Sequence, residues 1–140
     1  MKKRKVLFIC TQNSSRSQMA EGLLRARYGH RYEVFSAGTK PLQVNPFAIA
    51  AMQEAGIDIS GHRSKSIDEF AEMDIDYAIT VCDNAREECP YYPQASQLIH
   101  HRFRDPAAVQ GSDQEILAEF RRVRDEIENW LDKAVITGLI

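Results

Sequence analysis

The chain has 140 residues, with 18 Lys and Arg against 20 Asp and Glu and a formal net charge of −2. This length favours one domain, 1–140, with enough residues to bury a core. Charges of both signs are spread along the sequence, so we expect neither nucleic acid nor a membrane surface as a partner.

The cysteine count and the start of the chain bear on where the protein works. Residues 2–5 are basic, but the apolar run after them, 6–9, is too short for a signal peptide or a membrane span. Three cysteines are an odd number and too few to staple a scaffold of this size, which favours free or redox-active thiols. We therefore expect a cytoplasmic protein, and nothing in the sequence calls for more than a monomer.

A cysteine ends the first predicted strand, 5–10, and a helical pattern follows at 15–28. In a parallel sheet, ligands bind outside the carboxyl ends of the strands, and the N-terminus of the following helix favours an anion. The same N–H dipoles, together with a guanidinium, favour the thiolate of Cys10. Cys10 is therefore predicted to be a nucleophile for a bound oxyanion.

The residues after Cys10 suit an oxyanion. Small or polar residues can wrap backbone N–H groups around a tetrahedral anion, namely Thr11, Gln12, Asn13, Ser14 and Ser15. Asn13 tolerates a left-handed backbone, and Arg16 offers a planar fork to two oxygens. Ser17 could cap the helix or hydrogen-bond the thiolate. The alternative is a buried strand-end cysteine beside an ordinary surface arginine, but the strand before the loop and the helix after it favour the functional interpretation.

The middle of the chain continues the alternation of strand and helix. A second strand is predicted at 32–36, a helix opened by Asn45-Pro46 at 45–55, a short helix at 66–70 and a third strand at 77–81. Cys82 directly follows the third strand and so lies at the same sheet edge as Cys10, where the two thiols could meet.

Cys89 comes seven residues after Cys82 and directly before Pro90. If the residues between the cysteines are helical, the two lie about 10 Å apart along the axis, whereas a disulfide needs Cα atoms about 4.4–6.8 Å apart. A bridge would require this polar segment to unwind; the alternative is two unrelated surface cysteines. A zinc site that adds His100 and His101 is a weaker hypothesis, because the spacing fits no usual pattern.

The fourth predicted strand, 97–101, is followed by Asp105-Pro106 at the same edge. A carboxyl group over the Cys10 loop could give or take a proton, although Asp-Pro alone is only a turn signal. A long terminal helix then begins with a capping box, Ser112 to Glu115, and its apolar residues step by three and four as far as Ala134. The whole pattern predicts an α/β fold with a four-stranded, mostly parallel sheet flanked by helices.

Together these motifs resemble those of the thioredoxin-coupled arsenate reductases, which are built on the low-molecular-weight tyrosine phosphatase fold, a flavodoxin-like three-layer sandwich. The likeness rests on 10–21, Ser36-Ala37-Gly38, Asn45-Pro46, the pair Cys82 and Cys89, Asp105-Pro106 and 122–127. The Cys-x5-Arg-Ser loop is typical of the superfamily, and the cysteine pair favours the reductase branch over the phosphatases.

The resemblance implies a relay of three thiols. Cys10 attacks arsenate, for which phosphate is an analogue, while loop residues 11–15 and Arg16 hold the anion. Cys82 then attacks Cys10, which expels arsenite and leaves a Cys10–Cys82 disulfide. Cys89 attacks Cys82 in turn, and thioredoxin reduces the resulting Cys82–Cys89 disulfide.

The resemblance also implies roles outside the relay. Asp105 would be the acid-base group, and turnover would need neither a metal nor an organic cofactor. Some members of this family bind potassium near the loop, and Asn13, Glu21 and Ser36 match that pattern. Lys65, however, falls where those members have an aspartate, so an ammonium group would replace the cation and we expect no strong potassium dependence.

Two rival functions remain open. A phosphatase would use Cys10, Arg16 and Asp105 and would be indifferent to the loss of Cys82 or Cys89. A non-catalytic redox or oxyanion sensor would be oxidised stoichiometrically, without turnover.

Overall fold

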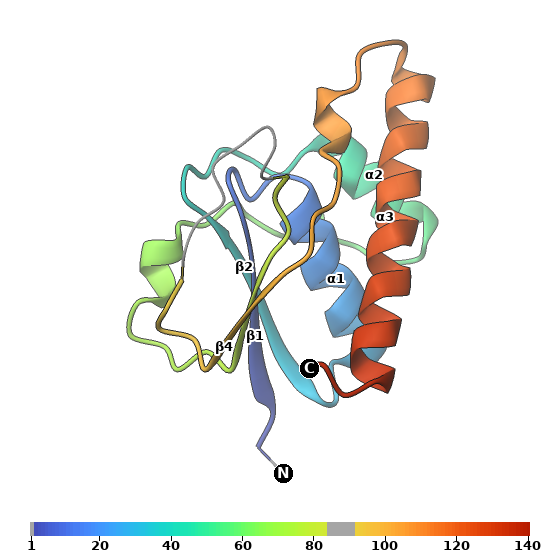
Figure 1. Cartoon of the computed structure of the whole chain (residues 1–140). Helices are drawn as coiled ribbons and strands as arrows, with labels where there is room; N and C mark the ends of the chain where they lie inside the picture. The colour runs from blue at the N-terminus through green and yellow to red at the C-terminus, as the bar shows by residue number, and fades with distance from the viewer. Residues whose placement is uncertain (1, 84–91) are drawn as a thin grey trace.

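The computed structural model describes residues 2–83 and 92–140. Within this part of the chain, four strands form one sheet in the order β2-β1-β3-β4, and all neighbouring strands are parallel. The strands are β1 (Arg4–Cys10), β2 (Tyr32–Gly38), β3 (Tyr77–Thr80) and β4 (Gln97–His100). The helices are α1 (Arg16–Tyr28), α2 (Pro46–Glu54) and α3 (Asp113–Ile136), with short 3-10 helices η1 (Ile67–Phe70) and η2 (Pro106–Ala108). Figure 1 shows this arrangement, which confirms the predicted α/β fold.

The sheet is buried on both faces of its inner strand β1. Val6, Phe8 and Cys10 point to one apolar cluster, whereas Leu7 and Ile9 belong to a second cluster on the opposite face. All five are at most 3% exposed. A strand covered on both sides has no polar face, which explains why this segment is an unbroken apolar run.

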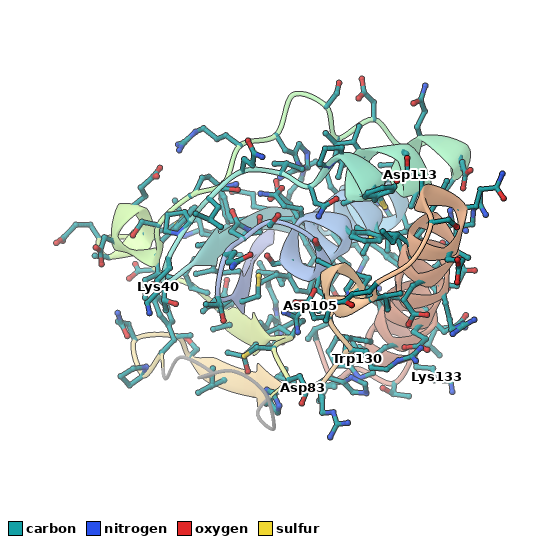
Figure 2. The ribbon with its side chains drawn as sticks, turned by 90° about the horizontal axis from the view of Figure 1, so that it is seen from above. Lys40, Asp83, Asp105, Asp113, Trp130 and Lys133 are labelled. Carbon is teal, nitrogen blue, oxygen red and sulfur yellow. The ribbon has the colours of Figure 1, made fainter. Side chains whose placement is uncertain are left out.

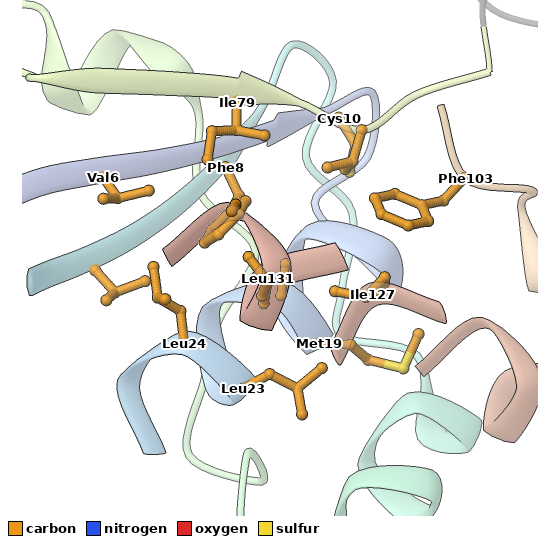
Figure 3. Packing of buried hydrophobic residues seen from close by; sticks show 14 of the residues in the cluster. Val6, Phe8, Cys10, Met19, Leu23, Leu24, Ile79, Phe103, Ile127 and Leu131 are labelled. Carbon is orange, nitrogen blue, oxygen red and sulfur yellow. The ribbon is translucent and has the colours of Figure 1, made fainter. Parts of the chain in front are cut away.

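The three α-helices cover one face of the sheet (Figure 1). Side chains of α1 and α3, such as Leu23 and Leu131, pack with Phe8 in the larger cluster (Figure 3). On the other face the described cover is thinner: Phe70 of η1 and Tyr92 pack against Leu7 there. Among the residues that the structure describes, this third layer is made of η1 and loops.

The ends of the elements follow the signals in the sequence. Ser112 and Glu115 form the predicted capping box of α3, and the side chain of Asn45 accepts the backbone N–H of Phe47 at the start of α2. β2 continues two residues beyond the predicted end because Ala37 and Gly38 still pair with β1.

Parallel strands bring the ends of β1 and β3 to one edge of the sheet. Thr80 is in register with Ile9, and the N–H of Val81 donates to the carbonyl of Ile9. Cys10 and Cys82 therefore leave neighbouring strands at the same edge, as predicted. No helix in the described ranges is long and apolar enough to cross a membrane.

Candidate active site

A pocket of about 300 Å³ lies at the carboxyl end of β1. Figure 2 views this end of the molecule, with Asp83 and Asp105 labelled. The lining combines the predicted loop with residues from after β3 and β4: Cys10, Thr11, Gln12, Ser14, Ser15, Arg16, Asp83, Asp105, Ala107 and Ala108. A thiol, a guanidinium and two carboxyl groups thus meet in one cavity.

Cys10 is a free thiol and only 3% exposed. Its Sγ lies 2.8 Å from the hydroxyl oxygen of Ser17 and accepts the backbone N–H of Asn13 at 3.3 Å. The side-chain amide of Asn13 donates to the same Ser17 oxygen at 2.8 Å. The proton of Ser17 is therefore available to the sulfur, an arrangement that stabilises a thiolate.

Asn13 holds the loop in shape. Its φ is 49°, so it adopts the left-handed backbone that the sequence predicted. Its Oδ1 accepts from the Gln18 side chain and from the backbone N–H of Lys65, each at 2.9 Å. Its Nδ2 also donates to Ser36 at 2.9 Å, so one side chain ties the loop to α1, β2 and the segment before η1.

A chain of side-chain hydrogen bonds leads from the loop towards the surface. His62 Nδ1 lies 3.0 Å from the Gln18 Oε1, and Gln18 continues through Asn13 and Ser17 to Cys10. Burial lowers the pKa of His62, although the Glu21 carboxylate opposes this shift. The sequence did not predict that Gln18 and His62 take part in the site, because His62 comes close to Gln18 on α1 only in the folded chain.

Arg16 is the first residue of α1 and is 4% exposed. Its Nη1 donates to the carbonyl of Phe103 at 3.2 Å, and its Nη2 lies 3.9 Å from Oδ2 of Asp105. The loop after β4 therefore holds the Arg16 guanidinium in place at the pocket. A braced fork is preorganised to bind two oxygens of an anion.

Asp105 lines the same pocket, which is where the sequence predicted it would lie. The side chain is 40% exposed, and its Oδ1 accepts the backbone N–H of Ala107 as the N-cap of η2. One carboxyl oxygen is therefore used structurally while the other faces Arg16. This geometry suits a group that exchanges protons with a ligand in the pocket.

Asp83 is a pocket residue that sequence reasoning missed. It is 5% exposed, lines the pocket and lies 3.4 Å from Nε of Arg102. Its place directly after Cys82, at the carboxyl end of a parallel strand, was the available signal.

The second cysteine of the predicted relay, Cys82, is fully buried and is bonded in a disulfide. Cys89 lies outside the described residues, so the predicted exchange between the two stays a prediction. The histidines of the zinc hypothesis have separate surroundings: His100 lies 2.7 Å from the Thr80 hydroxyl, and the His101 ring packs against Trp130. Residues 2–83 and 92–140 contain no group of three or more His, Cys, Asp or Glu that could hold a metal ion.

The expected ammonium group lies beside the loop. Lys65 Nζ is 3.6 Å from Oε1 of Glu21, and the Ser36 hydroxyl donates to the same carboxylate. Both charged side chains are largely covered, with 13% of Lys65 and 7% of Glu21 exposed. Burial lowers the pKa of Lys65, and the Glu21 carboxylate acts in the opposite direction.

Comparisons with known proteins show which family the chain resembles. The family model for low molecular weight phosphotyrosine protein phosphatase matches residues 5–137. An arsenate reductase from Halalkalibacterium halodurans is 44% identical over 138 residues, which cover 99% of each chain.

Two solved structures are also similar. One, described as an arsenate reductase in the phosphate binding state, has 34% identity and a TM-score of 0.80, covering 96% of this chain and 98% of that one. The other, a thioredoxin-dependent arsenate reductase of Corynebacterium glutamicum, has 27% identity and a TM-score of 0.67, covering 96% of this chain and 63% of that one. With a family model that spans nearly its whole length, the chain belongs to the low molecular weight phosphotyrosine protein phosphatase family.

Proposed function

We propose that this protein reduces arsenate to arsenite through a relay of Cys10, Cys82 and Cys89. The observation that carries the proposal is the pocket in which the Cys10 thiol meets the braced Arg16 guanidinium, with Cys82 leaving the neighbouring strand. The 44% identity to an arsenate reductase over nearly the whole chain supports the same reaction.

In the first step, loop residues 11–15 and Arg16 bind the arsenate oxygens, and the Cys10 thiolate attacks arsenic. A sulfur–arsenic bond forms and an arsenic–oxygen bond breaks. The departing oxygen needs protons to leave as water, and Asp105 supplies one of them. Ser17 keeps Cys10 in its reactive form through the contact at 2.8 Å. Binding of phosphate by the arsenate reductase of similar structure supports an oxyanion in this pocket.

In the second step, the Cys82 thiolate attacks Sγ of Cys10. A disulfide forms, the sulfur–arsenic bond breaks, and its electron pair stays on arsenic, which leaves as arsenite. Cys89 then attacks Cys82, which frees Cys10 and moves the disulfide to Cys82–Cys89. The placement of β3 beside β1 supports an exchange between Cys10 and Cys82.

The relay needs a reductant that supplies two electrons for each arsenate. We propose thioredoxin, whose dithiol becomes a disulfide as Cys82–Cys89 is reduced. The description of the Corynebacterium glutamicum relative as thioredoxin-dependent supports this partner. A thioredoxin-coupled cycle belongs in the cytoplasm, and we propose that the protein works there as a monomer.

Weak phosphatase activity is also proposed, because a loop that binds arsenate can bind a phosphate ester of similar shape and charge. The match to the phosphatase family model supports this side activity. It needs Cys10, Arg16 and Asp105, and it does not need Cys82 or Cys89.

The first experiment measures arsenite production with thioredoxin, thioredoxin reductase and NADPH. We compare the wild type with Cys10→Ser, Cys82→Ser and Cys89→Ser, and we expect each substitution to abolish turnover. Hydrolysis of p-nitrophenyl phosphate is the matched control: it is expected to be lost in Cys10→Ser alone. Phosphatase activity without arsenate turnover would assign the protein to the rival function.

A single-turnover version separates the steps of the relay. Without an added reductant, the reduced wild type and Cys89→Ser should each release one arsenite per chain. Cys89→Ser should then retain a Cys10–Cys82 disulfide, detectable by peptide mass spectrometry, and Cys82→Ser should release no arsenite. Oxidation of the wild type without arsenite release would favour the sensor.

A further inference from the structure

A second hollow, of about 450 Å³, lies at the opposite edge of the sheet. It forms where the start of β1, the turn before β2 and the end of the chain after α3 come together, and both chain ends lie at this foot of the sheet in Figure 1. Its lining residues are Lys2, Lys3, Arg4, His30, Arg31, Tyr32, Gly138 and Ile140. β1 separates this hollow from Cys10 by about 20 Å, at roughly 3.3 Å per residue.

The lining of this hollow, which we call the basic hollow, is strongly cationic. Lys2, Lys3, Arg4 and Arg31 are all exposed, so four positive charges surround one concave surface. Among the described residues that line it, none has a carboxylate side chain. Clustered like charges on a concave surface raise the local concentration of anions and favour their binding.

One residue that lines the hollow, Tyr32, has a buried hydroxyl group without a partner. Tyr32 is 3% exposed, and its hydroxyl has no hydrogen-bond partner within the described part of the chain. The neighbouring Tyr77, by contrast, accepts a hydrogen bond from Arg4. Burial raises the pKa of Tyr32, so its hydroxyl keeps the proton that it would donate. Buried polar groups are nearly always hydrogen-bonded, and an exception calls for an explanation.

The surroundings of Tyr32 indicate what would pair with it. The guanidinium of Arg31 lies 5.5 Å from the centre of its ring, and Arg4 is its register partner on β1. The hydroxyl oxygen is covered in this structure, so the side chains around it must shift before a ligand oxygen can pair with it, and that oxygen then lies near cationic side chains. The volume falls within the range of about 300–1,000 Å³ that is usual for small-molecule sites, which favours a compact ligand over an extended acidic peptide.

We propose that the basic hollow binds a multiply charged phosphate-bearing anion, with Tyr32 donating a hydrogen bond to one oxygen and Arg4, Arg31 and the two lysines neutralising the charge. The ligand chemistry is that of linked phosphates, either free as pyrophosphate or as part of a nucleotide. The site is distinct from the oxyanion loop at Cys10 and does not depend on the arsenate reaction.

The test is an NMR titration of the whole protein with sodium pyrophosphate and, in a second arm, with ADP. Amide resonances of Arg31, Tyr32 and Gly138 report the basic hollow, and those of Thr11 and Ser15 report the Cys10 loop. We expect saturable shifts at the hollow. Equal affinity for the two probes identifies linked phosphates alone as the determinant, whereas tighter ADP binding identifies a nucleotide.

Two variants and a matched control test the contacts. Tyr32→Phe removes only the hydroxyl and Arg31→Gln removes one charge; each should weaken binding at the hollow by about tenfold, as expected for one hydrogen bond or contact to a charged group. Arg121→Gln removes the same charge at a distant ion pair with Glu54, 2.7 Å in length, and should leave the affinity unchanged.

Thermal unfolding provides an independent measurement. Without ligand, Tyr32→Phe should melt at the same temperature as the wild type or higher, because the hydroxyl that it loses has no partner. Pyrophosphate should raise the Tm of the wild type more than that of Tyr32→Phe. Shifts confined to the Cys10 loop, affinities unchanged in either variant, or binding of a glutamate-rich peptide in place of pyrophosphate would each overturn the proposal.

Discussion

At the scale of single residues, the carboxyl group of Asp105 has two separable tasks. Its Oδ1 caps η2 by accepting the N–H of Ala107 at 3.0 Å, while its Oδ2 faces Arg16 across 3.9 Å. Asn keeps the capping oxygen but cannot donate a proton as an acid. Asp105→Asn should therefore lower kcat for arsenate by about a hundredfold and change KM much less.

Steady-state kinetics with the thioredoxin system check this expectation, with thermal unfolding alongside to confirm that the cap survives. Asp113→Asn, an exposed change in the first turn of α3, is the matched control and should keep wild-type kcat. A kcat within twofold of the wild type in Asp105→Asn would remove this residue from the proton transfers.

Ser17 offers a test of how the thiolate is stabilised. Its hydroxyl oxygen accepts from Asn13, which leaves its proton available to Sγ of Cys10 at 2.8 Å. A hydrogen bond to a charged group contributes about 1.5–3 kcal/mol, so Ser17→Ala should slow alkylation of Cys10 by iodoacetamide at pH 7 by about tenfold or more. Ser60→Ala, at an exposed turn, should alkylate at the wild-type rate. Equal rates for Ser17→Ala and the wild type would show that the helix and loop suffice.

The contact between Lys65 and Glu21 leads to a prediction about potassium. The ammonium group already lies 3.6 Å from Glu21, so the wild type should have the same Tm and activity in KCl and NaCl. Lys65→Asp removes that cation and adds a second buried carboxylate, which a monovalent cation would have to neutralise. This variant should be less stable and should recover more in KCl than in NaCl.

Melting curves at matched ionic strength measure both effects. Lys133→Asp, an exposed change of the same charge on α3, should show no difference between the salts. A wild-type Tm or activity that rises clearly with potassium over sodium would contradict the prediction.

The residues that sequence reasoning identified differ from those that it missed in how they reach the pocket. Cys10, Arg16 and Ser17 belong to one contiguous motif, so local patterns were enough to place them. Asp105 could be placed because it follows a parallel strand. His62 reaches the loop only through Gln18, a contact between residues 44 positions apart, and no periodicity reports such a contact.

At the scale of elements, the end of β2 packs closely against the backbone of the loop that follows Cys10. A Cβ on Gly38 would lie 2.5 Å from the carbonyl oxygen of Thr11 and 2.8 Å from the N of Asn13. Both atoms are backbone, so the loop itself would have to move. Gly38→Ala should therefore destabilise the protein by about 1–3 kcal/mol and weaken oxyanion binding.

Denaturant unfolding and a phosphate titration measure these two effects. Gly61→Ala is the control, because a Cβ there meets nothing within 4 Å, and its stability should stay near that of the wild type. Unchanged stability and phosphate affinity in Gly38→Ala would show that the loop has room to shift.

Strands and helices were predicted well where the pattern of apolar residues was clear. β1 was recognisable as an unbroken apolar run, and α3 as apolar residues at helical spacing after its Ser112 cap. The end of β2 was less clear, because Ala37 and Gly38 extend the strand only by pairing with β1. The β-propensity of a residue does not tell which strand it will pair with. The exchange between Cys82 and Cys89 stays a prediction that the relay experiments test.

At the scale of the whole molecule, the parallel sheet separates two anion sites. Its carboxyl edge has the Cys10 loop, where α1 begins, and its opposite edge has the proposed basic hollow. Every strand of a parallel sheet ends at the same edge. Residues that follow the strands therefore lie at one edge of the sheet, and residues that precede them lie at the other. Chemistry at one edge and ligand binding at the other can therefore be altered by separate substitutions.

Two partly buried histidines, His62 and His101, make the stability of the whole protein depend on pH. Burial lowers the pKa of His62 beside α1, with Glu21 opposing, and burial also lowers the pKa of His101, whose ring packs against Phe103 and Trp130. The unfolded chain takes up these protons near pH 6.5, whereas the folded protein takes them up only at lower pH. Unfolding thus binds protons, so this stability is fully present above about pH 7 and is lost as the pH falls through 6.5 towards the folded values, by at most about 1.4 kcal/mol per pH unit for each histidine.

Urea unfolding between pH 7.5 and 5.5 measures this loss. His101→Phe keeps an aromatic ring beside Trp130 and His62→Gln keeps a polar side chain near Gln18, and each should flatten part of the slope because one proton-binding group is removed from the unfolded chain. His30→Gln, at an exposed position, should leave the slope as it is in the wild type. A wild-type stability that stays constant or increases as the pH falls through this range would mean that the folded protein accepts these protons as readily as the unfolded chain does.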